Sequence, residues 1–294
     1  MILTGWMTYG QYEPLQSNYM YNNMYINPAN TGISGLGSVF LWHRSQWVNF
    51  TGAPTTEMLA FEYPTRKASY GLLAFYDQNG PVTQTIASGY FSYFVEVGFD
   101  QYISFGLSAG VRHLDYDPTK LNIKDPGENF VSQAQKKTGG LVGAGVTYYS
   151  EKWYVGLSSP NLAPLTEIGS SPNTTMVFSP HIYLSGGVTL DINYNIKFRP
   201  SIVMRYAKGI PFMVETTANF QFYDKFTAGL AYRLQSAYSL LLYTKISKNF
   251  GLGYSFDLDA TKIRKYNYGS HELFLRFSFE TSQGNVRFQS PRFF

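Results

Sequence analysis

The stretch NFGLGYSFDLD, residues 249–259, decides the fold by its alternation. Its apolar series is Phe250, Leu252, Tyr254, Phe256 and Leu258, and its polar series is Gly251, Gly253, Ser255, Asp257 and Asp259. Successive side chains of a β-strand point to opposite faces, so a strict period of two predicts a strand with one apolar and one polar face.

The same alternation flanks this stretch on both sides, at residues 226–235 and 272–280. Each run has about the 9 to 11 residues that a tilted strand needs to cross a bilayer. Alternation alone does not distinguish a protein core from lipid. The polar faces are small and of mixed charge, as in a wet lumen, and this favours an outer-membrane barrel.

Composition supports strands over helical spans. The chain has 294 residues, of which 44% are hydrophobic, 18% aromatic and 14% charged. No run of about 18 apolar residues occurs, which excludes a transmembrane helix by length. The 25 Tyr and 23 Phe residues would suit aromatic girdles at two membrane interfaces. A soluble β-sandwich is the alternative interpretation.

Fourteen strands are predicted, all antiparallel, in an all-β fold. Their approximate ranges are 37–45, 55–63, 69–76, 82–95, 101–113, 139–149, 152–159, 177–190, 195–206, 212–223, 225–235, 237–246, 249–258 and 270–280. The ninth indicates which face is which, because Lys197, Arg199 and Arg205 share one side. A Lys or Arg at mid-bilayer on the lipid face costs about 2–4 kcal/mol, so this side should face the lumen.

An even number of strands places both termini on one side of the membrane. If the first strand starts in the periplasm, the long connections, 114–137, 160–175 and 259–269, all follow odd strands and should be extracellular. A sandwich has no reason to place every long loop at one end.

The barrel is expected to span residues 36–280. Residues 1–10 (MILTGWMTYG) are interpreted as the remnant of a signal peptide, with a frayed N-terminus as the alternative. Residues 11–35 lack strand periodicity and are expected to form an irregular plug or docking segment, and residues 281–294 a periplasmic tail.

Several kinds of chemistry are not indicated. The net charge of +4 is scattered, so no nucleic-acid surface is expected. Without cysteine there is neither a disulfide framework nor a thiolate metal site. The four histidines, His43, His113, His181 and His271, lie on four different strands, with His181 and His271 both able to face the lumen. No enzyme activity, metal or cofactor is predicted.

Luminal charges could serve function or structure. The lumen is expected to contain Arg112, Lys197, Arg199, Arg205, Arg233, Lys245, Arg276, Asp257, Asp259, Glu272 and Glu280. Such residues could line a channel or hold an internal plug. Alternatively, they pair simply because buried charges must be satisfied.

The N-terminal region carries a recognisable signature. YEPLQSNYMYN at residues 12–22 and INPANTG at 26–32 are followed by RSQW at 44–47 and GAPTT at 52–56. Order and spacing resemble the "QYMFN…INPAxxG" and "RxQW…GAPxT" blocks of the PorP/SprF family of Bacteroidota outer-membrane proteins. The resemblance implies a barrel of the type IX secretion system and, in some species, of gliding motility. The partners that it implies are PorE-like and PorK/PorN-like components and an exported adhesin with a type B C-terminal domain.

Candidate functional residues come from this signature and from the predicted lumen. The set is Tyr19, Met20, Asn27, Pro28, Arg44, Gln46, Trp47, Arg112, Arg199, Arg205, Arg233 and Arg276. Tyr19 and Met20 would pack irregular backbone against the wall, in a plug or a docking segment. Arg44 and Trp47 could clamp the first loop or contact a cargo.

The favoured function is non-enzymatic: to help export or anchor a surface protein in the outer membrane. The alternative is a passive or ligand-gated transport channel, porin-like or fatty-acid-transporter-like, because glycine-rich inner faces leave room for a ligand path.

Overall fold

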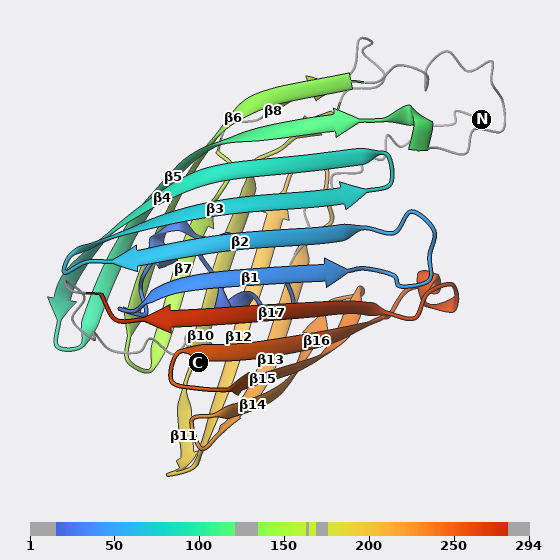
Figure 1. Ribbon diagram of the computed structural model, residues 1–294. Helices are drawn as coiled ribbons and strands as arrows, with labels where there is room; N and C mark the ends of the chain where they lie inside the picture. The colour runs from blue at the N-terminus through green and yellow to red at the C-terminus, as the bar shows by residue number, and fades with distance from the viewer. Residues whose placement is uncertain (1–15, 121–134, 163–164, 169–175, 282–294) are drawn as a thin grey trace, which may run out of the picture.

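The described part of the chain, residues 16–120, 135–162, 165–168 and 176–281, forms a closed antiparallel β-barrel in this computed structural model (Figure 1). Consecutive strands pair in order, β1 also pairs with β17, and β10 pairs with β12, so the sheet closes on itself. Strands can cross a bilayer in this form because closure supplies backbone partners that lipid cannot. The predicted fold class is confirmed.

The barrel has fourteen strands. The first seven are β1 (Gly37–Ser45), β2 (Thr55–Pro64), β3 (Ala68–Asn79), β4 (Val82–Gly98), β5 (Gln101–Tyr116), β6 (Gln135–Ser150) and β7 (Trp153–Ser159). The eighth consists of two pieces, β10 (His181–Val188) and β11 (Leu190–Asn193), which both pair with β12. The last six are β12 (Ile196–Ala207), β13 (Met213–Phe222), β14 (Phe226–Arg233), β15 (Ala237–Lys245), β16 (Phe250–Asp259) and β17 (Ser270–Phe279).

The connection before β10 departs from the sequence-based expectation. It contains a separate hairpin, β8 (Leu165–Ile168) paired with β9 (Met176–Phe178), where a loop was predicted up to residue 175. The eighth barrel strand begins at His181 instead of residue 177, directly after Pro180. Proline has no N–H to donate to a strand ladder, which explains a strand that starts after it.

The remaining regular elements among the described residues are four short 3-10 turns: η1 (Tyr19–Tyr21), η2 (Pro28–Asn30), η3 (Pro118–Lys120) and η4 (Lys262–Lys265). None of the helical segments in the described residues has the length and apolar character to cross a membrane.

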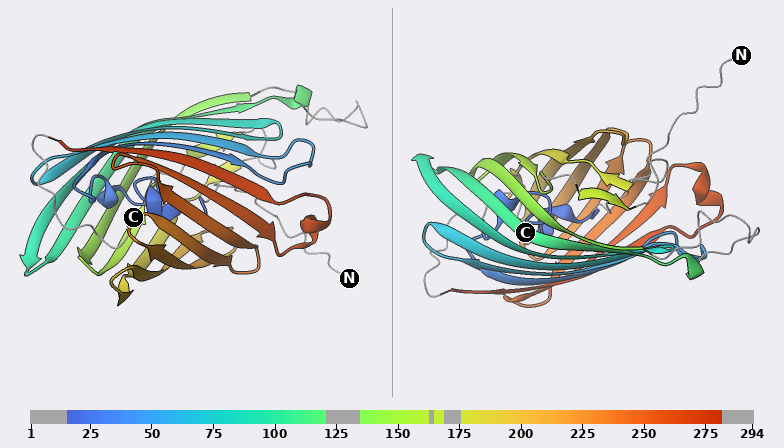
Figure 2. Two further views of the ribbon diagram at one scale, coloured as in Figure 1. Left: turned by 60° about the horizontal axis from the view of Figure 1, so that its bottom comes forward. Right: turned by 90° about the horizontal axis from the view of Figure 1, so that it is seen from above.

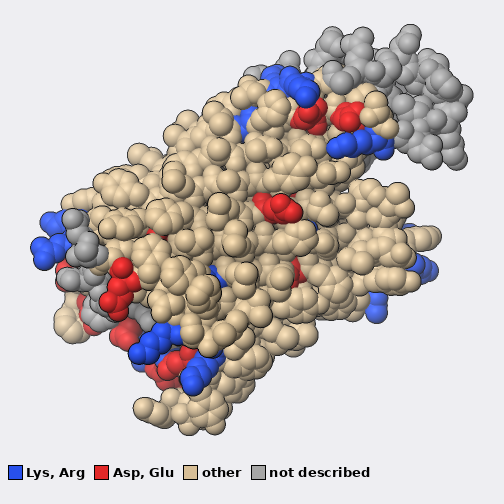
Figure 3. All heavy atoms as spheres, viewed as in Figure 1, with Lys and Arg blue, Asp and Glu red and all other residues tan. Residues whose placement is uncertain are grey.

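The two faces of the wall follow the predicted alternation. In β16, Gly251, Ser255 and Asp257 are buried, whereas Phe250 is exposed. Lipid-facing apolar side chains gain hydrophobic stabilisation in a bilayer, and the polar face is left to the interior. Figure 3 shows the same division: one face of the barrel is largely uncharged between two ends where charged groups gather.

The long connections leave one rim of the barrel, which we call the long-loop rim. They follow β1, β5, β7 and β16, and the opposite, short-turn rim carries tight turns such as the one between β13 and β14 (Figure 1). The distribution matches the predicted sorting of long and short connections.

Candidate functional site

The interior of the barrel is filled by residues 16–36, which we call the luminal plug. Both views of Figure 2 show this blue segment inside the barrel, and nearly all of its residues are buried. Ser17 lies near β16 and β17 in the long-loop half, and Gly32 lies at the short-turn end of β2. The plug therefore runs along the lumen before the chain enters β1.

The wall supplies hydrogen-bond partners to the irregular backbone of the plug. Hydroxyl groups on three strands donate to plug carbonyls: Ser92 Oγ to Thr31 O at 2.8 Å, Ser104 Oγ to Ala29 O at 2.5 Å and Ser158 Oγ to Ile26 O at 2.7 Å. Buried backbone groups outside regular structure are costly without such partners. The luminal serines thus fix the plug to the barrel wall through hydrogen bonds.

Asn27 and Pro28, both candidates from the sequence, lie where the plug meets β5 and β6. The Asn27 side chain donates to Thr147 Oγ1 at 3.0 Å and accepts from the Ala29 N–H at 2.9 Å, which caps η2. A Cβ placed on Gly106 would lie 2.0 Å from Ala29 N. Glycine at this position lets the plug backbone touch the wall, so the room expected for a ligand path is occupied here.

Aromatic side chains pack the other side of the plug. The Tyr21 ring centroid lies 4.5 Å from that of Tyr243 and 4.8 Å from that of Phe274. Tyr19 and Met20 are almost fully buried beside it, and the Tyr19 hydroxyl lies 2.8 Å from Ser201 Oγ. This aromatic layer packs the plug against β15 and β17.

Arg44, on the luminal face of β1, is the centre of a buried charge network. Its guanidinium pairs with Asp257 of β16 at 2.8 Å and with Glu272 of β17. Glu272 also accepts hydrogen bonds from Trp42 Nε1 at 3.3 Å and from the Ser17 N–H at 3.0 Å. Arg44 therefore faces the lumen and joins three strands to the plug.

Arg233 extends the network across β13 and β14. Its guanidinium binds Glu215 through Nε at 2.7 Å and Nη2 at 2.6 Å, and Nη2 also donates to Ser17 Oγ at 3.2 Å. Ser17 Oγ in turn donates to Asp257 at 2.9 Å. Sequence reasoning missed Ser17 and Glu215. Neither residue stands out in the sequence. Ser17 is one of many residues in the N-terminal signature, and Glu215 is one of several on the polar face of its strand.

Gln46 and Trp47 hold the connection between β1 and β2 at the long-loop rim. The Gln46 N–H donates to Pro54 O at 3.0 Å, closing this loop. Trp47 donates through its backbone to Ser270 Oγ at 3.1 Å and through Nε1 to Asp259 at 3.3 Å. Trp47 thus ties the first loop to β16 and β17.

The other candidate arginines are luminal but do not form one site. Arg112 on β5 is almost fully buried, and Arg205 lies near the long-loop end of β12. Arg199 on β12 and Arg276 on β17 lie in the short-turn half, both largely buried. The structure therefore divides the predicted set between the two halves of the lumen.

The histidines do not gather in the lumen. His181 is buried inside, but the expectation that His271 could also face the lumen is wrong. The β17 register turns Ser270 and Glu272 inward, so His271 points outward, with its Nδ1 at 2.7 Å from the Tyr254 hydroxyl. Within the described residues, no group of three or more His, Asp or Glu side chains could hold a metal ion.

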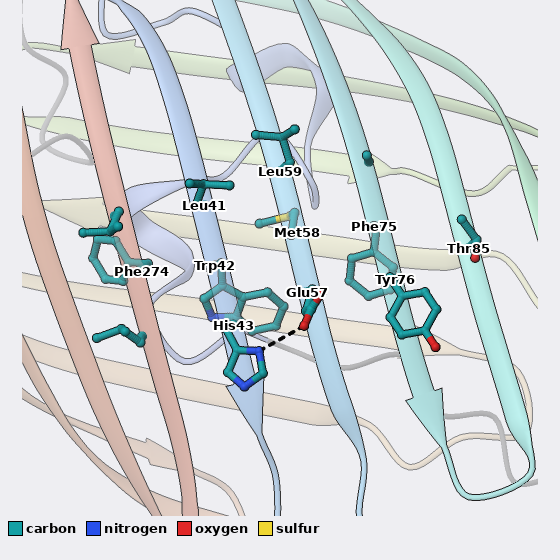
Figure 4. A pocket seen from close by; sticks show the side chains of 13 residues that line it. Leu41, Trp42, His43, Glu57, Met58, Leu59, Phe75, Tyr76, Thr85 and Phe274 are labelled. Carbon is teal, nitrogen blue, oxygen red and sulfur yellow. Dashed lines mark ion pairs between the residues drawn. The ribbon is translucent and has the colours of Figure 1, made fainter.

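His43 takes part in a polar arrangement on the outer face. Its Nε2 lies 3.0 Å from Ser45 Oγ, and its Nδ1 lies 3.5 Å from Glu57 Oε1. Ser45, His43 and Glu57 are thus arranged like the nucleophile, base and carboxylate of a catalytic triad. Figure 4 shows His43 and Glu57 pointing toward each other above an open groove of about 460 Å³ that Leu41 and Leu59 help to line.

This arrangement has no matching oxyanion site among the nearest backbone donors. Acyl transfer depends on N–H groups aimed at the developing oxyanion. The N–H groups that follow Ser45 are engaged: that of Gln46 with Pro54 O and that of Trp47 with Ser270 Oγ. The geometry therefore supports an exposed polar contact better than a hydrolase.

A closed fourteen-stranded barrel with an apolar belt and a plug bonded into its lumen defines an outer-membrane β-barrel protein. The chain belongs to the family described as "Type IX secretion system membrane protein PorP/SprF", whose sequence model matches residues 8–277. The family resemblance seen in the sequence is thereby confirmed. Comparison with curated proteins gave no match.

Solved outer-membrane barrels share the fold at low sequence identity. The Pseudomonas putida toluene transporter TodX is 10% identical with a TM-score of 0.52, over 88% of this chain and 94% of TodX. The monoaromatic hydrocarbon channel CymD is 14% identical with a TM-score of 0.50, over 91% and 94%. Acinetobacter baumannii Omp33 is 7% identical with a TM-score of 0.50, over 84% and 100%. These likenesses concern the fold alone.

Proposed function

We propose that this protein is a non-enzymatic binding component of the type IX secretion system. Its long-loop rim, facing the cell exterior, would hold an exported adhesin with a type B C-terminal domain. Its short-turn rim, at which β1 begins and β17 ends, would face the periplasm and dock to PorE-like and PorK/PorN-like components. Family membership supports the secretion role.

The observation that carries this proposal is the hydrogen-bonded plug. An open pore needs an unobstructed lumen, whereas here wall serines and the Arg44 and Arg233 networks bind the plug. A barrel filled in this way is suited to present two rims to partners. Surface display of one adhesin would depend on it, and small-solute uptake would not.

The test is purification of the tagged chain from outer membranes in mild detergent, with identification of the proteins that accompany it. A large exported protein or periplasmic secretion components at near-equal amounts would support the proposal. A barrel that purifies alone, together with unchanged surface display after deletion of the chain, would contradict it.

A transport channel is the second candidate, favoured by the fold likeness to TodX and CymD. In this alternative the plug would move to admit a small apolar ligand. Planar-bilayer conductance or uptake of toluene into proteoliposomes separates the two functions, because the binding role predicts a closed barrel in both measurements.

A further inference from the structure

A single carboxylate faces outward on the four strands β1, β2, β3 and β17. Apart from histidine, these strands contain six charged residues, of which five are buried on the luminal side: Arg44, Glu62, Asp77, Glu272 and Arg276. Glu57 of β2 is the sixth, and its side chain is 64% exposed. Barrels seldom leave an ionisable side chain on the lipid-facing side, where water is scarce, and such residues commonly mark a functional site.

Strand register places Glu57 at the edge of the apolar belt. Successive partners on β1, β2, β3 and β4 form a row of outward polar side chains: His43, Glu57, Tyr76 and Thr85. The next outward row toward the short-turn rim is apolar and consists of Leu41, Leu59, Ala74 and Ala87. The change from one row to the next marks the depth at which lipid headgroups meet acyl chains.

An open groove of about 460 Å³ crosses the boundary between the two rows (Figure 4). His43 and Glu57 line it at one end, and Leu41 and Leu59 line it at the other. Ala74, the register partner of Leu59, also lines the groove, and its small side chain leaves room above the strand. The groove thus has a polar end toward the long-loop rim and an apolar end toward the bilayer core, which is the polarity of a single lipid molecule.

The polar end of the groove offers negative charge without a Lys or Arg to balance it. His43 Nδ1 lies 3.5 Å from Glu57 Oε1, and a neutral imidazole leaves the carboxylate with its full charge. None of the residues that line the groove is Lys or Arg. Arg44 and Arg276, on the bordering strands, are buried in the lumen. The groove therefore favours a cationic hydrogen-bond donor and disfavours an anionic headgroup.

We propose that this groove binds one membrane lipid whose headgroup carries a primary ammonium. The ammonium N–H groups would donate to the Glu57 carboxylate, and an acyl chain would lie over Ala74 between Leu41 and Leu59. Charge-assisted hydrogen bonds are the strong ones, and the low dielectric at this depth strengthens them further. The inference requires only a barrel in a bilayer, so it is independent of the proposed secretion role.

The test is native mass spectrometry of the full chain, titrated in detergent with three lipids that share their acyl chains. Phosphatidylethanolamine has N–H donors, phosphatidylcholine has a cation without them, and phosphatidylglycerol is anionic. Wild type should bind the first at least about tenfold more tightly than the other two. Glu57→Gln should abolish this preference. Glu96→Gln, which neutralises an exposed carboxylate near the short-turn end of β4, should keep it.

The apolar end is tested by Ala74→Phe, which should fill the groove and weaken binding of phosphatidylethanolamine at least about tenfold. Ala228→Phe, on the outer face of β14, is the matched control and should bind as wild type does. Heat-dependent gel mobility verifies that each variant is folded.

Three results would overturn the inference. Equal binding of the three lipids by wild type would indicate ordinary annular lipid only. An unchanged preference in Glu57→Gln would remove the carboxylate from the site. A protein that copurifies with wild type and is lost in Glu57→Gln, without any lipid preference, would assign this face to a protein partner. The secretion role fails by a different observation, the absence of secretion components from the purified wild-type chain.

Discussion

Ser17 Oγ lies 2.9 Å from both carboxylate oxygens of Asp257, a residue 240 positions further along the chain. The contact joins the start of the plug to β16. In the closed barrel, β16 is separated from β1 by β17 alone. The same hydroxyl accepts from Arg233, so one small side chain links the plug to the buried charge network.

Replacing Ser17 by Ala should loosen the plug without unfolding the barrel. The change leaves Asp257 and Arg233 with fewer partners, and a buried polar group that loses its hydrogen bond costs about 1–3 kcal/mol. Hydrogen exchange of residues 16–36 should rise, whereas exchange in β3 and β4 should not. Ser45→Ala, on the outer face, is the control. Unchanged exchange in the plug would show that Ser17 does not anchor it.

Gly106→Ala should push the plug away from β5. A Cβ at this position would lie 2.0 Å from Ala29 N and 2.1 Å from Pro28 C, both backbone atoms, and overpacking of this kind costs about 1–3 kcal/mol. Gly140→Ala is the matched control, because no described atom lies within 4 Å of its new Cβ. Limited proteolysis and bilayer conductance measure the outcome. Identical cleavage of the two variants would contradict the contact.

Arg44→Met should destabilise the barrel strongly. The change leaves Asp257 and Glu272 buried with one cation fewer, and breaking a buried pair costs about 3–5 kcal/mol. The measurement is gel electrophoresis after heating in detergent, in which the folded barrel migrates faster than the unfolded chain. The temperature at which the fast-migrating form disappears should fall. Adding Glu272→Gln should restore part of the loss. Additive losses in the double variant would mean that the two residues act independently.

Acid should remove a small stabilisation at the short-turn rim. The hydrogen bond from Lys197 holds the pKa of the Asp224 carboxyl below its ordinary value. Because the folded-state pKa is the lower one, the stabilisation is complete above the unfolded pKa of about 3.9 and is lost as pH falls through the folded value.

For this partly exposed pair the contribution should not exceed about 1 kcal/mol. Asp224→Asn should therefore lower the unfolding temperature slightly at pH 7, and the difference from wild type should narrow as the pH falls below the unfolded pKa of about 3.9. Asp100→Asn, in the short turn between β4 and β5 on the same rim, controls for the loss of a carboxylate. A difference in unfolding temperature that does not narrow as the pH falls would contradict this origin.

The Ser45, His43 and Glu57 arrangement should not hydrolyse esters. The nearest backbone donors are already bonded, so a developing oxyanion would find no stabilisation there. Wild type and Ser45→Ala should both lack activity on p-nitrophenyl esters and on phospholipid vesicles. Labelling of Ser45 by a fluorophosphonate would refute the expectation.

Sequence reasoning reached the fold because its evidence is local. Period-two runs such as 249–259 reveal strand faces, and Lys197 with Arg199 identifies the luminal side. It failed at two points: Pro180 shortens the eighth strand, and the regular alternation of β17 places His271 on the outward side with Leu273, not inward with Glu272. The partners of Arg44 could not be read from the sequence because Asp257 and Glu272 come from distant strands.

The sequence by itself determined the barrel, its fourteen strands, the lipid-facing side of the wall and the family, because alternation, loop length and motif spacing are properties of short segments. The tertiary structure alone decided the path of residues 16–36 and their bonds to Asp257, Glu272 and Ser104. An irregular segment has no periodicity to indicate which surface it covers. Its partners are set by ring closure and register, which bring residues far apart in the chain into one interior.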